Sequence, residues 1–383
     1  MTEGIATQER LPITPTVITW ARSRAGYSAD DAAKYFPRIA DWESGAATPT
    51  YRQLEMMADK FQLPVAAFFF PSPPDIQLTQ QSFRTLPDHY FELIPRTVRS
   101  FVRKGQAMQL NLAELNDQRN PAETLITTDL PIRSSTSVEN IALKVRAYLG
   151  ISLAEQYKWA TVEDALEGWR DAFARAGVFV FKDAFHAEGY FGFCLYDKDF
   201  PIIYVNNSST KTRQLFTLFH ELAHLLFHTS GIDVVDDSYI GHLAERERRV
   251  EIMCNQFAAA FLVPDEAFSE ALTGRGTTRD TAALLADRFK VSREVIYRKL
   301  LNRELISEKE YEDAAASWAK QATPKERGGN YYYNQIAYLG ARYIDLALTR
   351  YNQHRFDSTQ LAAYLNIKPK NVEAFEFVYA GLK

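Results

Sequence analysis

The sequence has few cysteines, no long apolar run and no excess of basic residues, and each shortage excludes a class of protein. Cys194 and Cys254 are the only cysteines among 383 residues, and neither belongs to a CxxC pair. This excludes a disulfide-stapled secreted fold and a cysteine zinc cluster. The longest apolar stretch, residues 65–70, is far too short to span a bilayer.

The charge balance argues against a dedicated nucleic-acid binder. The formal net charge is −4 at pH 7, whereas such proteins are usually basic. The N-terminal segment MTEGIATQERLPITP lacks the apolar core of a signal peptide. Together with the scarcity of cysteine, these features predict a protein of the reducing cytoplasm without a membrane segment.

What the chain does contain is enough apolar and aromatic mass for a folded core. Hydrophobic residues make up 46% and aromatic residues 13% of the sequence, which argues against disorder. A length of 383 residues predicts two or three domains. Hydrophobic periodicity predicts helices over most of the chain, interrupted by runs typical of short strands at 177–181, 189–197 and 201–207. The predicted fold class is therefore α+β, mostly helical, with a small antiparallel or mixed sheet.

Two helices that follow the third strand carry the strongest chemical signal. The first is predicted over residues 212–228 and contains the motif HELAH, and the second is predicted over 244–264. His220 and His224 are four residues apart, so both imidazoles leave the same face of the helix. Zinc accepts two such nitrogens, and Glu221 beside them is placed to act as the general base in peptide hydrolysis.

A catalytic zinc site needs a third protein ligand and one open position. Glu251, on the second helix, is the favoured third ligand because a carboxylate is common in sites of this type. The alternatives are Asp236 and Asp237, which lie in the intervening loop and would give a less rigid site. Cys254 and Asn255 follow Glu251 by one turn on a similar face of the helix.

Three further residues near the motif are candidates for supporting roles. His228 extends the motif to HELAHLLFH, but a straight helix carries it about 12 Å along the axis from His220. This favours packing, or support of a ligand, over metal binding. Tyr239 and His242 lie between the two helices and are candidates for stabilising the oxyanion. The expected cofactor is one Zn²⁺ per chain, with Mn²⁺ as an alternative.

The segment that contains the motif reads NN-x₅-RQLFTLFHELAHLLFH and is followed by E-x₂-CNQFAAAFLVP. Over residues 178–264 this combination resembles the ImmA/IrrE metallopeptidase family. The resemblance implies that Glu251 is a metal ligand and that Asn255 is structural or supports a ligand. Cys254 departs from the family pattern, which usually has alanine there. The best-known members cut XRE-type repressors, which implies a regulatory protease with a protein substrate.

Several further segments resemble longer family members, which place an XRE-type helix-turn-helix before the peptidase. These segments are WARSRAGYS, WESGAATPTYRQLEMMADKF, FFFPSPP and SFRTLP. The resemblance implies an XRE-like domain at 14–72, a linker with a long helix at 73–135, and a zincin-like metallopeptidase domain at 136–265. A helical C-terminal region with a helix-turn-helix-like segment follows at 266–383.

DNA binding is the less favoured use of the N-terminal module. An XRE domain reads DNA with its third helix, and the stretch KYFPRIAD is short for that helix and contains Pro37. Residues 11–73 carry six basic and six acidic side chains, so phosphate contacts would contribute little. Docking of a partner, or packing on the peptidase, is favoured.

The segment 278–302 also resembles a helix-turn-helix. Arg293, Arg298 and Lys299 are its candidate phosphate contacts. A helical hairpin that braces the peptidase is the favoured interpretation.

The favoured function is a zinc-dependent endopeptidase that cleaves a regulatory protein. The expected partner is an XRE-type repressor, and the expected outcome is control of stress, phage or mobile-element genes. The alternative is a DNA-binding transcription regulator, or a toxin–antitoxin component, whose metal domain senses or docks rather than cuts. Glu221 favours the enzyme, because a sensor needs no general base beside its two histidines.

Overall fold

The chain folds into two compact units. The computed structural model describes residues 11–25, 27–61, 63–73, 94–130, 132, 136–234, 243, 245–320 and 330–382. Unit 1 comprises Met1–Thr79, Ser100–Gln118 and Ala341–Lys383, and unit 2 comprises Gln80–Arg99 and Arg119–Gly340. Each unit has its own hydrophobic core. None of the helices in the described ranges combines the length and the apolar character needed to cross a bilayer.

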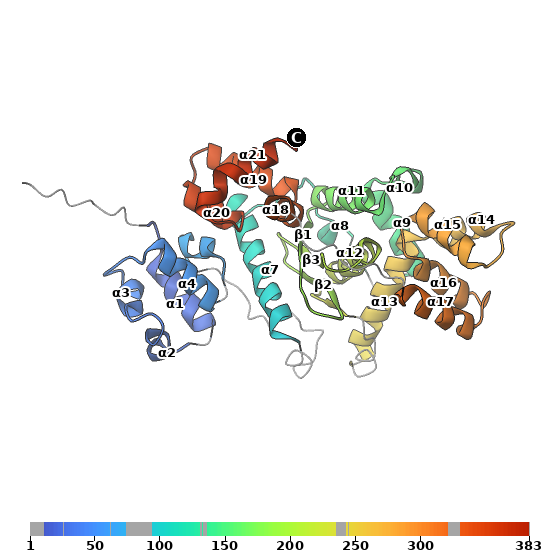
Figure 1. Cartoon of the computed structure of the whole chain (residues 1–383), viewed down its shortest axis with the longest axis horizontal. Helices are drawn as coiled ribbons and strands as arrows, with labels where there is room; N and C mark the ends of the chain where they lie inside the picture. The colour runs from blue at the N-terminus through green and yellow to red at the C-terminus, as the bar shows by residue number, and fades with distance from the viewer. Residues whose placement is uncertain are drawn as a thin grey trace, which may run out of the picture. The chain divides into compact units, whose positions relative to one another are not determined.

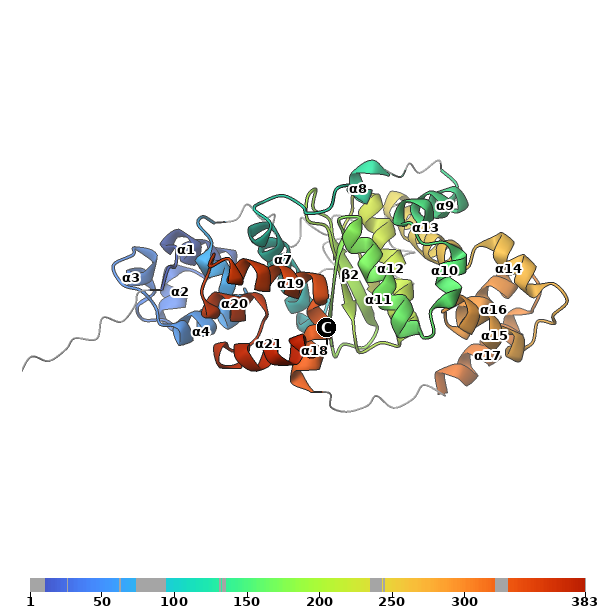
Figure 2. The ribbon, with the colours of Figure 1, turned by 90° about the horizontal axis from the view of Figure 1, so that it is seen from above.

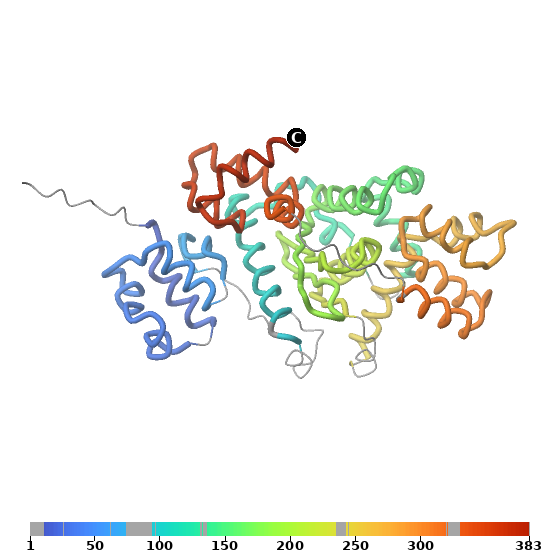
Figure 3. Tube along the Cα trace, viewed as in Figure 1, coloured from blue at the N-terminus to red at the C-terminus, as the bar shows by residue number. Residues whose placement is uncertain are grey.

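Unit 1 is helical throughout its described residues and is built from both ends of the chain, as the blue and red segments of the trace show (Figure 3). Its elements are α1 (Pro15–Arg24), α2 (Ala29–Ala33), α3 (Ile39–Glu43), α4 (Tyr51–Phe61), η1 (Val65–Phe69), α7 (Arg96–Leu115, from Ser100 onward), α19 (Ala341–Asn352), α20 (Ser358–Tyr364), η3 (Pro369–Asn371) and α21 (Val372–Ala380). Contacts between α20 and η1 join the two ends. Arg350 adds a second link by donating to the carbonyl of Leu115 over 2.7 Å.

The helices at the start of unit 1 are short where an XRE-type domain would read DNA. Both α2 and α3 have only five residues. Ser28 caps α2 by accepting the backbone N–H of Asp31. In α3, Glu43 is paired with Arg22 at 2.6 Å. Whether this module reads DNA or docks a partner stays a prediction.

Unit 2 combines a small sheet with helices packed on it (Figure 1). Its strands are β1 (Phe179–Asp183), β2 (Tyr190–Leu195), β3 (Ile202–Asn206) and β4 (Ile232–Val234). Its helices are α8 (Ile126–Asp129), α9 (Val138–Leu149), α10 (Leu153–Lys158), α11 (Val162–Arg175), α12 (Lys211–Leu226), α13 (Glu245–Leu262), α14 (Asp265–Leu272), α15 (Arg279–Phe289), α16 (Arg293–Asn302), α17 (Glu308–Lys320) and α18 (Tyr331–Leu339).

The sheet has the strand order β1-β3-β2-β4. Strand β1 is parallel to β3, whereas β2 is antiparallel to β3 and to β4. The mixed sheet and its first three strands confirm the sequence-based prediction. The fourth strand, β4, was not predicted, because three residues are too few to show a period of two. It returns the chain to the sheet directly after α12, the helix that carries HELAH.

The two faces of the sheet carry different side chains. One face is aromatic, and the rings of Phe193 and Tyr204 are stacked there at 5.2 Å between centroids. The other face presents small and β-branched side chains to α11 and α12, which lie side by side along the sheet (Figure 2). Gly192 allows the closest approach, because a Cβ at this position would lie 2.5 Å from Cγ2 of Thr217 on α12.

An aromatic cluster fixes α13 against α12. The rings of Phe219 on α12 and Phe261 on α13 are stacked with centroids 4.1 Å apart. Trp169 of α11 meets both rings edge-on, at 5.0 and 5.2 Å. All three side chains are fully buried. The cluster therefore sets the position of every residue of α13 that faces α12.

Replacing Phe261 with alanine should lower the free energy of unfolding of unit 2 by about 3–5 kcal/mol, because the removed ring leaves a cavity between two helices. Urea denaturation followed by circular dichroism measures the change. Leu143→Ala is the control, because its side chain on α9 is 62% exposed and should change stability by no more than about 0.5 kcal/mol. Equal effects of the two substitutions would contradict the structural role of the cluster.

Candidate metal centre

Two helices supply the side chains of the centre. Thr210 caps the start of α12 by accepting the N–H of Arg213, and the helix then runs along the sheet to Leu226. Its HELAH face is turned toward α13, the helix that carries Glu251. The pairing of these helices therefore decides whether a carboxylate meets the two imidazoles.

The structure brings His220, His224 and Glu251 together. The Nε2 atoms of the two histidines are 3.2 Å apart. Oε2 of Glu251 lies 3.6 Å from Nε2 of His220, and Oε1 lies 3.4 Å from Nε2 of His224. Two ligand atoms each about 2.0–2.2 Å from a tetrahedral zinc ion are separated by about 3.3–3.6 Å. The spacing of these three donors therefore fits a zinc ion.

The outer nitrogens of both imidazoles are held by neighbouring side chains. Nδ1 of His220 lies 3.0 Å from Oδ1 of Asn255, and Nδ1 of His224 lies 3.4 Å from Oγ1 of Thr229. The Thr229 hydroxyl donates to the carbonyl of His224 over 3.0 Å, so its oxygen is left to accept from Nδ1. Donation by both Nδ1 atoms would leave both Nε2 atoms with lone pairs directed at the space near Glu251. Such facing lone pairs and a carboxylate repel one another unless a cation or a proton lies between them.

Glu221 lies beside this cluster and has no exposed surface. Its carboxylate interacts with the thiol of Cys194 on β2, which is also buried. Burial raises the pKa of Glu221 to about 8, because transfer out of water disfavours the charged carboxylate. A divalent cation nearby would counter this effect by stabilising the carboxylate. The group is therefore poised to exchange a proton near neutral pH, which general acid–base catalysis requires.

The remaining predicted site residues are placed elsewhere or lie outside the described residues. His228 has its ring against Tyr196, with centroids 4.9 Å apart, and its Nε2 is 2.8 Å from the carbonyl oxygen of Thr127. It is not one of the three clustered donors, and its role in packing or in support of a ligand stays a prediction. The positions that lie outside the described residues are Asp236, Asp237, Tyr239 and His242.

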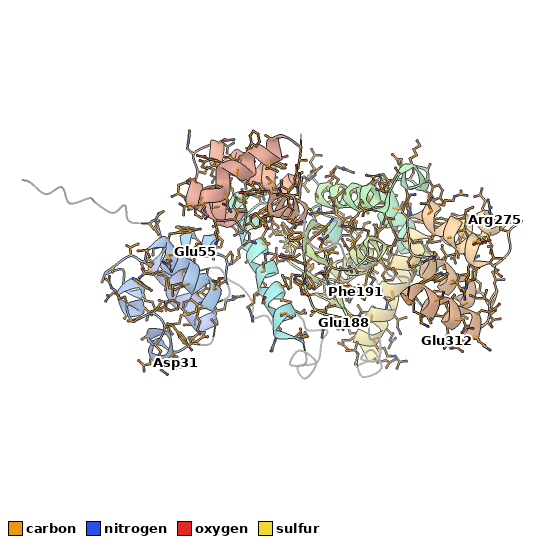
Figure 4. The ribbon with its side chains drawn as sticks, viewed as in Figure 1. Asp31, Glu55, Glu188, Phe191, Arg275 and Glu312 are labelled. Carbon is orange, nitrogen blue, oxygen red and sulfur yellow. The ribbon has the colours of Figure 1, made fainter. Side chains whose placement is uncertain are left out.

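The sequence did not reveal a second group of side chains, which joins β4 to α12. Its two members on α12, Thr217 and Arg213, lie about one and two turns before His220. Asp233 of β4 is buried and accepts hydrogen bonds from Thr217 over 2.6 Å and from Arg213 over 2.5 Å. The Arg213 guanidinium lies 3.8 Å from the ring centroid of Phe191, which is labelled in Figure 4. The pattern of residues 213, 217, 220 and 224 on one helix face was the available signal. Asp233 itself gave no signal in the sequence, because it lies in β4, the strand that was not predicted.

The predicted phosphate contacts of the segment 278–302 point at neighbouring helices. The Arg293 guanidinium lies 5.0 Å from the ring centroid of Trp318, and that of Arg298 lies 4.5 Å from Tyr311. Lys299 is paired with Asp265 at 2.5 Å. These contacts favour the bracing hairpin over a phosphate-binding surface, and DNA binding by the segment stays a prediction.

Comparison with known proteins agrees with this geometry. Residues 173–301, from the end of α11 through most of α16, match the IrrE N-terminal-like domain of the M78 peptidases. Over this stretch the chain is similar to metallopeptidases of the ImmA/IrrE family. The radiation response metalloprotease IrrE of Deinococcus radiodurans is 35% identical over 98 residues, which are 25% of this chain and 30% of that protein. The protein of the same name from Deinococcus deserti is 37% identical over 98 residues, or 25% of this chain and 34% of that protein.

The IrrE-type domain therefore accounts for only part of the chain. The aligned residues span about a third of the length of the two Deinococcus relatives. The match includes both helices of the metal centre and continues through α14 and α15. Unit 1 lies outside it, since the matched residues fall wholly within unit 2.

Asn255→Ala should weaken metal binding by about 10-fold or more, because His220 loses the acceptor that orients its ring. Competition with a chromophoric chelator measures the affinity. Asn255→Asp keeps an oxygen acceptor and should retain most of the metal affinity. Gln256→Ala is the matched control, since Gln256 is the next residue of α13 and is exposed. If Asn255→Ala and Gln256→Ala bound metal equally well, Asn255 would have no role in orienting the ligand.

Proposed function

We propose that the chain is a zinc-dependent endopeptidase that cleaves a regulatory protein. The observation that carries the proposal is the convergence of His220, His224 and Glu251 beside a buried Glu221, within an IrrE-type domain. A cation held by two imidazoles and one carboxylate matches the usual ligand set of catalytic zinc, with a position left for water or substrate. Manganese is the alternative metal.

Glu221 is proposed as the general base and acid of peptide hydrolysis. When bound, the metal supplies Lewis-acid polarisation of the scissile carbonyl and of the attacking water. Glu221 takes a proton from that water as the new C–O bond forms. It then delivers the proton to the amide nitrogen as the C–N bond breaks, so that the leaving group departs as an amine. Exclusion of bulk water strengthens the electrostatic interactions that stabilise the transition state.

The burial of the centre supports regulated rather than constant activity. The exposed fractions of His220, Glu221, His224 and Glu251 are 2%, 0%, 0% and 4%. We propose that the surrounding chain moves before a peptide reaches these side chains. A protease that waits for a specific partner or signal suits the cleavage of a repressor, which is the substrate class that the family resemblance implies.

Glu221→Gln should retain zinc and lose cleavage by about 10²–10⁴-fold, because the amide cannot take up a proton. The assay is co-expression of the chain with an XRE-type repressor, followed by mass spectrometry for a new terminus in the repressor. Zinc content by elemental analysis is measured on the same preparations. A Glu221→Gln protein that cuts as well as the wild type would refute the enzymatic proposal.

Glu251→Ala should weaken zinc binding by at least about 10-fold, since one of three protein ligands is lost. Equilibrium dialysis against zinc, with elemental analysis, gives the affinity. Glu245→Ala on the same helix is the control, because its side chain is 83% exposed. Equal zinc content in the two variants would remove Glu251 from the ligand set.

A further inference from the structure

The chain that leaves α12 folds back onto the second histidine of the motif. His228 adopts a left-handed conformation with φ 57°, which ends the helix and reverses the chain. The N–H of Thr229 then donates to the carbonyl of His224 over 2.9 Å. Two residues later, Gly231 lies directly against the imidazole of His224. The turn thus returns to a side chain of the helix that it terminates.

Gly231 fits against this ring because it has no side chain. A Cβ at position 231 would lie 2.6 Å from Cδ2, 2.7 Å from Cγ and 2.8 Å from Nε2 of His224. Three ring atoms at nearly equal distances mean that the glycine faces the plane of the imidazole. The glycine is required here by this close approach to the ring.

The backbone of Gly231 is fixed from the other side by β2. Its carbonyl accepts the N–H of Cys194 over 3.0 Å, and its own N–H donates to Sγ of Cys194 over 3.3 Å. Cys194 is fully buried in the core beneath α12. Gly231 therefore cannot retreat from the imidazole without breaking two hydrogen bonds inside the core.

We propose that Gly231 is a positioning residue for the metal, because it fixes the plane of the His224 imidazole so that Nε2 points at His220 and Glu251. A methyl group at position 231 would be relieved most easily by rotation of that ring, which is the movable partner of the contact. The fold would tolerate this rotation and the metal centre would not. The inference rests on the proposed function in one respect, namely that a metal binds at His224.

The test is Gly231→Ala in the full chain, with zinc as the probe. Zinc affinity should fall by about 10-fold or more, as expected when the support of a metal ligand is lost. The Tm of the metal-free protein should change little, whereas the rise in Tm on adding zinc should shrink, because that rise depends on affinity. The absorption spectrum of the cobalt-substituted protein should also change, since the geometry of the ligands is altered.

Two other glycines provide the controls. Gly276→Ala should behave as the wild type, because its nearest neighbour would be Cγ2 of Thr278 at 3.6 Å. Gly192→Ala should lower the Tm of the metal-free protein, because its Cβ would lie 2.8 Å from the backbone oxygen of Tyr204, which cannot move aside. The contrast separates loss of metal geometry from loss of folding.

Unchanged zinc affinity in Gly231→Ala would overturn the proposal. If that variant fails to fold, Thr229→Val replaces it, since it removes the acceptor of His224 Nδ1 while the N–H of residue 229 can still donate to the carbonyl of His224. Affinity equal to the wild type would overturn the proposal as well. A wild-type chain that binds zinc and cuts nothing would contradict the proposed peptidase function but not the positioning role of Gly231. A wild-type chain that binds no zinc would contradict both proposals.

Discussion

Contact between α12 and α13 is the constraint on which the metal centre depends. The two imidazoles of HELAH need only one helix to share a face. Their carboxylate partner belongs to a different helix and reaches them because Phe219 and Phe261 stack in a core shared with Trp169. Hydrophobic packing, which has no direct part in the chemistry, therefore sets the distances of about 3.5 Å between donors that one cation requires.

Burial gives the centre its electrostatic character. Two imidazole lone pairs and a carboxylate are brought together with almost no access to water, and such an arrangement is unfavourable unless positive charge compensates it. Binding of a divalent cation should therefore stabilise the folded unit as well as prepare it for catalysis. The same burial raises the pKa of Glu221 to about 8, which keeps its proton exchange within reach of neutral pH.

Strand β2 supports the metal centre through its contacts with α12 and with the turn that follows α12. Gly192 admits Thr217, which binds Asp233, while Cys194 holds the turn that contacts His224. The sheet thus fixes the start of the HELAH helix through β4 and its end through the turn before β4. Cys194 has a structural role here, because its sulfur accepts the backbone N–H of Gly231.

The sequence by itself determined the parts of this protein that depend on local periodicity and spacing. Three strands, the HELAH helix, the helix of Glu251 and the hairpin of α15 and α16 all followed from patterns of a few residues, and the mixed α+β class followed from their order. The tertiary structure alone decided the rest. β4 is too short to show a pattern, Gly231 matters only through the ring it touches, and Asp233 depends on partners brought together by folding. The assembly of unit 1 from both ends of the chain is likewise invisible to local patterns, because the free energy of such contacts comes from packing between residues hundreds of positions apart.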